Sequence, residues 1–97
     1  MENRIPDMNN SYGIDIQSAI ADMLRAERAI QEMTLDELAE KAGMPKVTLQ
    51  RYLKAQRDIP LKSLADICRA LDVPMGEVIQ RAEERLQAKK LHEGETK

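Results

Sequence analysis

Residues 35–54 read LDELAEKAGMPKVTLQRYLK and hold two short amphipathic segments on either side of one glycine. In the first segment, apolar residues recur at helical spacing: Leu35, Leu38, Ala39 and Ala42. Gly43 follows where a left-handed residue ends a helix, and Pro45 suits the start of the next helix, where its missing N–H costs nothing. The second segment places Leu49, Tyr52 and Leu53 on one face. The stretch therefore predicts two short helices packed across a tight turn.

The second of these helices carries the unopposed positive charge of the chain. No acidic residue occurs between Lys41 and Arg57, a window whose cations are Lys41, Lys46, Arg51, Lys54 and Arg57. Two helices joined in this way form a helix-turn-helix, whose second helix enters the major groove of DNA. The motif and its charge together indicate nucleic-acid binding.

The composition fits a small helical domain with a locally basic surface. The chain has 97 residues, enough for one domain, and its aromatic content is 2% with no Phe or Trp. Its core must therefore be aliphatic and rich in Met, which favours packed helices. The net charge is −2, but a basic patch within an acidic remainder still attracts phosphate.

The motif resembles a known family. Leu38-Ala39, Gly43-Met44-Pro45, Leu49 and Tyr52 are similar to the helix-turn-helix of phage repressors and of Cro/C1-type bacterial regulators, the XRE family. The similarity continues through residues 57–60 and 64–73 and covers about residues 17–80. It implies an all-α, five-helix lambda-repressor-like DNA-binding domain, with residues 14–80 as the domain. A flexible N-terminal arm (residues 1–13) and a C-terminal helical extension with a frayed tail (residues 81–97) are expected around it.

Three positions depart from the family pattern. Leu35 stands where members usually carry Gln, Leu53 replaces a common Glu, and Ala55 replaces the expected Gly. Because Ala resists positive φ, we expect the turn after the second motif helix to differ from that of the family. These departures concern individual DNA contacts more than the fold.

The other helices are predicted from caps and apolar stripes. The first runs from an N-cap at Asp15 to about Gln31, with the stripe Ile16, Ala19, Ile20, Met23, Leu24 and Ile30. Thr34 and Glu37 form a capping box before the motif. Pro60 opens a fourth helix with the inward residues Leu61, Leu64, Ile67, Cys68 and Leu71, in which Cys68 is a buried hydrophobe rather than a redox sensor. A fifth helix spans about residues 75–91, and residues 92–97 should fray.

The outward side of the second motif helix supplies candidate base-reading residues: Lys46, Val47, Gln50 and Arg51. Arg51 and Lys46 can donate to guanine O6 and N7, Gln50 can pair with adenine, and Val47 can contact a thymine methyl. Candidate phosphate-contacting residues lie at the edges of this surface: Thr34, Lys54, Gln56 and Arg57. The alternative is a basic helix face that contacts only solvent.

The fifth helix has more apolar surface than one small domain needs. Ala82 and Leu86 continue the stripe of Val78 and Ile79 outward, so we expect them to form a homodimer interface. A fold-back within the chain is the alternative, and a protein partner of this helix is another.

These observations favour a transcription regulator, most simply a repressor that occupies a double-stranded DNA operator. The alternative is a protein-interaction module, such as an antitoxin that binds a toxin through the C-terminal helix; an adaptor that no longer binds DNA is a third possibility. We expect no enzyme activity, catalytic residue, cofactor or metal site, since the one histidine, His92, falls in the tail. No membrane span or secretion signal is evident, which indicates a cytoplasmic protein, associated with the bacterial nucleoid or encoded by a phage.

Overall fold

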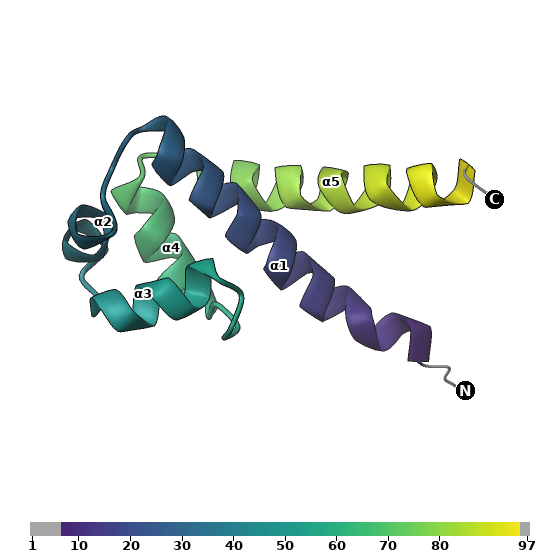
Figure 1. The fold of residues 1–97 in the computed structure, drawn as a ribbon, viewed down its shortest axis with the longest axis horizontal. Coiled ribbons are helices and arrows are strands. Elements are labelled where there is room, and N and C mark those ends of the chain that lie inside the picture. The colour runs from purple at the N-terminus through teal and green to yellow at the C-terminus, as the bar shows by residue number, and fades with distance from the viewer. Residues whose placement is uncertain (1–6, 96–97) are drawn as a thin grey trace.

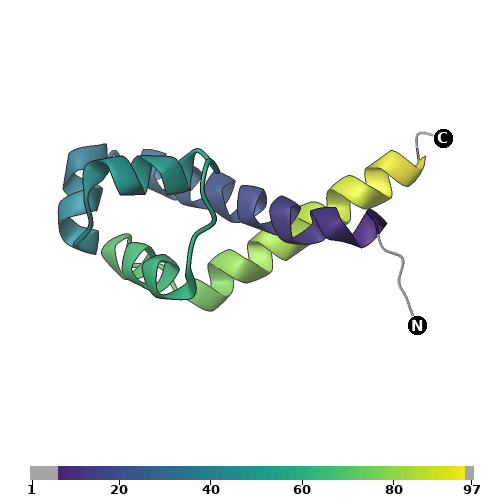
Figure 2. The same cartoon turned by 90° about the horizontal axis from the view of Figure 1, so that it is seen from below.

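The computed structural model describes the backbone of residues 7–95 and the side chains of residues 11–89. This part of the chain forms five helices and no strand: α1 (Asp7–Ile30), α2 (Leu35–Ala42), α3 (Lys46–Leu53), α4 (Leu61–Ala70) and α5 (Met75–Glu95). Helices α2, α3 and α4 pack together at one end of the molecule, from which α1 and α5 extend toward the opposite end (Figures 1 and 2). The predicted all-α, five-helix architecture is confirmed.

Both long helices exceed their predicted lengths. Helix α1 begins at Asp7 rather than Asp15, so the prediction of an unstructured arm is wrong for residues 7–13. Asn and Gly in that segment are weak helix formers, but adding residues to a helix that tertiary packing has already formed is easier than starting one. Helix α5 likewise continues to Glu95, so the predicted fraying is wrong for residues 92–95. Residues 1–6 and 96–97 lie outside the described residues.

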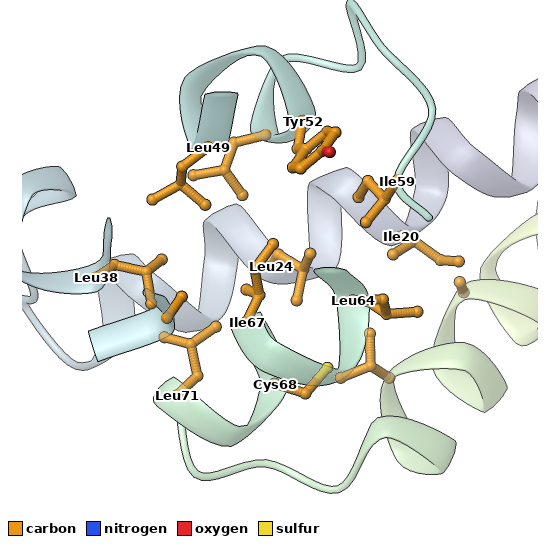
Figure 3. Close-up of a cluster of buried hydrophobic side chains, with 14 of the residues drawn as sticks. Ile20, Leu24, Leu38, Leu49, Tyr52, Ile59, Leu64, Ile67, Cys68 and Leu71 are labelled. Atoms are coloured by element: carbon orange, nitrogen blue, oxygen red, sulfur yellow. The ribbon is translucent and has the colours of Figure 1, made fainter. Parts of the chain in front are cut away.

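The core is aliphatic and centres on α1. Its most completely buried side chains come from four helices: Leu24, Leu38, Leu49, Ile67, Cys68 and Leu71 (Figure 3). Two residues of the predicted stripes are instead exposed, Ile30 by 73% and Leu61 by 68%. Each lies in the terminal turn of its helix, so the apolar stripe continues past the point where buried neighbours end.

Helices α1 to α4 all end in a left-handed residue, of which only Gly43, with φ 71°, is a glycine. The others are Glu32, Ala55 and Asp72, with φ of 54°, 57° and 58°. At α3, the Gln56 N–H donates to the Arg51 carbonyl over 2.9 Å and the Ala55 N–H donates to the Tyr52 carbonyl over 3.0 Å. This pair of bonds is the Schellman motif. The expectation that Ala55 would change this turn is therefore wrong, because the capping bonds hold Ala in the conformation that Gly usually supplies.

Candidate nucleic-acid interface

Helix α3 is oriented by its buried face. Leu49 is 0% exposed and points into the core with Tyr52, as Figure 3 shows, and Leu53 is buried beside them. The helix therefore turns its opposite side outward. The predicted phase of the buried face is confirmed.

The predicted base-reading residues occupy this outward side to different degrees. Lys46 and Arg51 are exposed, and Val47 is 57% exposed although it is apolar. Gln50 is half-buried. Arg51 stands one turn after Val47, so a guanidinium and an exposed apolar side chain lie close together on one short helix.

The N-terminus of α2 is capped as its residues predict. The Thr34 N–H donates to Glu37 Oε1 over 2.8 Å, and the Glu37 N–H donates to Thr34 Oγ1 over 3.0 Å, which completes the capping box. This reciprocal pairing uses the backbone N–H of Thr34 and one lone pair of its hydroxyl. The hydroxyl hydrogen is what Thr34 can still donate to a phosphate, and the Glu37 carboxylate lies beside it.

The other predicted phosphate-contacting residues gather at the opposite end of the motif. Lys54, Gln56 and Arg57 are all exposed and lie at or just after the C-terminus of α3. The left-handed Ala55 reverses the chain between them. The predicted phosphate-contacting residues thus form two groups: a basic group at the end of α3, and Thr34 at the start of α2, whose first turn carries Asp36 and Glu37.

Side chains of α1 that the sequence analysis did not single out hold the backbone near this surface. Arg25 donates to the Leu53 carbonyl, at the C-terminus of α3. Gln17 accepts the Ile59 N–H over 2.7 Å and donates to the Ile59 carbonyl over 3.4 Å, which fixes the loop before α4. Their signal in the sequence is faint: both are polar residues next to the apolar stripe of α1.

Arg28 of α1 and Gln31, the residue that follows α1, bond two further chain segments. Arg28 donates to the Met33 carbonyl over 2.9 Å, and Gln31 donates to the Leu71 carbonyl over 2.7 Å. Together with Arg25 and Gln17, they bond backbone at the end of α3, in the α3–α4 loop, in the α1–α2 loop and at the end of α4. These side chains therefore fix the position of the motif relative to α1.

Charge is unevenly distributed over the candidate interface. Lys46 Nζ lies 3.2 Å from Asp36 Oδ1 of α2. Arg51, Lys54 and Arg57 make no ion pair with any of the side chains described. The C-terminal half of the surface thus presents free cations, whereas its N-terminal corner is neutralised within the protein.

Cys68 plays no part in this surface. It is 2% exposed, and burial raises the pKa of its thiol to about 11. The neutral thiol that results is a poor nucleophile. Cys68 therefore packs as a small hydrophobe, as predicted.

The dimer prediction is wrong for one of its two residues. Ala82 is 0% exposed within the chain and belongs to the hydrophobic core, where α5 packs against α1. A second chain cannot reach it without opening that contact. Leu86, one turn further along, is half-buried at the edge of the core. The fold-back alternative therefore holds at Ala82, because the stripe of α5 meets α1 before it could meet another molecule.

None of the described helices combines the length and apolar character that crossing a membrane requires. Nor do three or more His, Cys, Asp or Glu residues gather into a metal-binding group within the described residues.

Comparison with known proteins identifies the family. The helix-turn-helix family model matches residues 24–78, more than half of the chain. The comparison with curated sequences finds no match. Two crystal structures of the clp gene regulator ClgR from Corynebacterium glutamicum are similar. One is 27% identical with a TM-score of 0.67 over 72% of this chain and 91% of its own. The other is 25% identical with a TM-score of 0.74 over 84% and 86%.

A third structure supports the fold. The restriction-modification controller protein C.AhdI from Aeromonas hydrophila is 21% identical, with a TM-score of 0.61 over 64% of this chain and 94% of its own. None of these findings supports the antitoxin alternative. The matched span contains the complete α2–α3 motif, its core and the outward face of α3. The chain belongs to the helix-turn-helix family, as a DNA-binding transcription regulator of the Cro/C1 type.

Proposed function

We propose that the protein is a repressor that binds an operator in duplex DNA and blocks transcription from it. The observation that carries this proposal is the outward face of α3, where Arg51 has no acidic partner among the described residues and Val47 is 57% exposed. The exposed Val47 gains nothing from water, and next to it Arg51 offers donors that no described acid occupies. The two together fit the floor of a major groove, where acceptors and thymine methyls lie side by side.

Within this proposal, each base-reading residue has its own task. Arg51 donates two parallel hydrogen bonds to guanine O6 and N7, Lys46 donates to the same kind of acceptor, and Gln50 pairs with adenine. Val47 packs on a thymine methyl. Because Gln50 is half-buried, its reach is the shortest of the four.

The phosphate contacts fix the register of the protein on the duplex. Lys54, Gln56 and Arg57 contact the backbone from the C-terminal end of α3, and Thr34 donates its hydroxyl hydrogen from the start of α2. The acidic neighbours of Thr34 make its contact the weakest of this group, since they repel phosphate.

The binding unit is a homodimer in this proposal. Leu86 is half-buried, and the far half of α5 diverges from α1 (Figure 1). A groove of about 850 Å³ lies between the two helices, with Tyr12 and Asp22 of α1 on one wall and Leu86 and Gln87 of α5 on the other. A second copy paired through this end would set two α3 helices about 34 Å apart, one turn of DNA. A different protein is the other occupant that this end of α5 admits.

The protein acts in the cytoplasm under this proposal, because that is where a bacterial or phage operator lies. Selection of bound fragments from a pool of random duplexes, with the full chain as bait, tests the function. An inverted repeat with half-sites one helical turn apart is the expected result. Recovery of no enriched sequence would contradict operator binding, and a single unrepeated site would contradict the dimer.

A further inference from the structure

One ion pair joins the two helices of the motif. Lys46 is the first residue of α3 and Asp36 is the second residue of α2, and their charged atoms lie 3.2 Å apart. The side chains are 54% and 75% exposed, so the pair lies at the surface. Among the described side chains, this is the one acid paired with a cation of α3.

The position of the pair gives it a role at the interface. The first turn of a recognition helix projects deepest into the groove, so Lys46 and its acidic partner approach DNA together. A phosphate that contacts Lys46 must either take the ammonium away from Asp36 or accept a carboxylate beside it. The first outcome breaks an ion pair, and the second places two anions at contact distance, where they repel.

Base reading does not carry this penalty. A lysine ammonium has three donors, so its ion pair with Asp36 leaves at least two of them for guanine O6 and N7. The carboxylate itself can accept the N4 amino hydrogen of a cytosine. The Lys46–Asp36 ion pair can therefore contact a G·C base pair, which offers both acceptors and an amino group. Its contact with a phosphate, which offers acceptors alone, is unfavourable.

We infer that Asp36 is a specificity-determining residue. Its ion pair with Lys46 disfavours contacts of Lys46 with phosphates and leaves contacts of Lys46 with bases favourable. This inference rests on the proposed function, because it concerns the same interface. It assigns to a carboxylate the task of weakening binding to random DNA, which is the competitor that any operator-binding protein meets in largest amount.

The test compares Asp36→Asn with a matched control. Asp66→Asn removes the same charge from a Lys–Asp pair of the same 3.2 Å length, on α4 and without a predicted DNA contact. Dissociation constants are measured by fluorescence anisotropy over a series of salt concentrations. Each variant is titrated against the duplex selected by the wild type and against a random-sequence duplex of equal length. Circular dichroism verifies that the helicity of both variants is unchanged.

Asp36→Asn is expected to tighten binding to random DNA about five-fold, the effect of one unit charge at contact distance in water. The slope of log affinity against log salt should steepen by about 0.9, because Lys46 gains a phosphate. Binding to the selected duplex should tighten less, so the specificity ratio falls. Adding Lys46→Met to Asp36→Asn should return the salt slope to its wild-type value.

Three outcomes would overturn the inference. In the first, Asp36→Asn and Asp66→Asn change random binding equally. In the second, Asp36→Asn tightens both duplexes by the same factor, which is a general charge effect. In the third, the salt slope does not change. A wild type that prefers no sequence overturns the proposed function and this inference together, whereas a selective wild type with an ineffective Asp36→Asn overturns the inference alone.

Discussion

Helices α3 and α5 are anchored in opposite ways. Helix α3 has 8 residues, and Leu49, Tyr52 and Leu53 among them are buried. Helix α5 has 21 residues, and its buried residues in the described range, Val78 and Ala82, both lie in its first half. The short helix is thus fixed by three buried side chains of its own, whereas in α5 the described side chains beyond Ala82 are half-buried at most.

The contrast separates two properties of a DNA-binding regulator. The orientation of the reading surface is determined within one chain, through the core beneath α3 and the bond from Arg25 to its last carbonyl. In the proposed dimer, the assembly of reading surfaces into pairs depends on the surface of α5. Substitutions in the two helices should therefore fail in different ways, and the following predictions test that separation.

The largest effect is expected beneath α3. Leu49→Asp should unfold the domain, because Leu49 is 0% exposed. Losing such a side chain costs about 2–5 kcal/mol, and burial of a carboxylate without a partner adds to this. The total is comparable with the whole stability of a small domain, roughly 5–15 kcal/mol. Loss of the helical circular dichroism signal at 25 °C checks the prediction.

Val47→Asp is the matched control for that change, since it adds the same charge two residues earlier at a position that is 57% exposed. It should fold normally and lose DNA binding, because the carboxylate faces bases and phosphates. A folded Leu49→Asp, or an unfolded Val47→Asp, would show that the two faces of α3 do not divide the tasks in this way.

The next effect concerns α5. Leu86→Glu should leave helicity unchanged, halve the mass measured by sedimentation and weaken operator binding about 100-fold, because a monomer loses the gain of a second half-site. Ala88→Glu, an equal charge change at an exposed residue that does not line the groove, should have little effect on any of the three. A wild type that sediments as a monomer both free and on DNA would remove dimerisation from the proposal.

Within the DNA-binding surface, base contacts and phosphate contacts should differ. Arg51→Ala should cost about 1–3 kcal/mol on the operator and relax the preference at one base position. Lys54→Ala should weaken binding to all sequences alike and flatten the salt slope by about 0.9. Binding titrations on operator and random duplexes distinguish the two. Equal losses on both duplexes for both variants would contradict the assigned roles.

The smallest effect is expected at the turn after α3. Ala55→Gly should stabilise the fold by about 1 kcal/mol, since a non-glycine residue at φ 57° carries a left-handed penalty of about 1–2 kcal/mol and Gly offsets part of that gain by its unfolded-state entropy. The melting temperature should rise by roughly 4–8 °C. Ala26→Gly, inside α1 four residues before its end and exposed, should instead lower it. A stabilising Ala26→Gly would indicate that the effect is not due to the backbone conformation at Ala55.

Local chemistry made part of this structure predictable. The capping box of Thr34 and Glu37, the stop at Gly43 and the buried phase of α3 each depend on neighbouring residues, and each was predicted. Tertiary outcomes were not accessible in the same way. The apolar stripe of α5 is compatible with a contact to α1 or to another chain. Only the fold shows that Ala82 is buried within its own chain. The positive φ at Ala55 depends on capping bonds that outweigh its propensity.

The bonds made by α1 and by Gln31, directly after it, have an evolutionary consequence. Arg25, Gln17 and Gln31 bond the backbone of Leu53, Ile59 and Leu71, and none of these bonds uses the partner's side chain. Bonds to main-chain atoms do not depend on which side chains α3 exposes. Substitution of the exposed residues of α3 therefore leaves these bonds intact, so such proteins can acquire new target sequences without a change in the packing that orients α3.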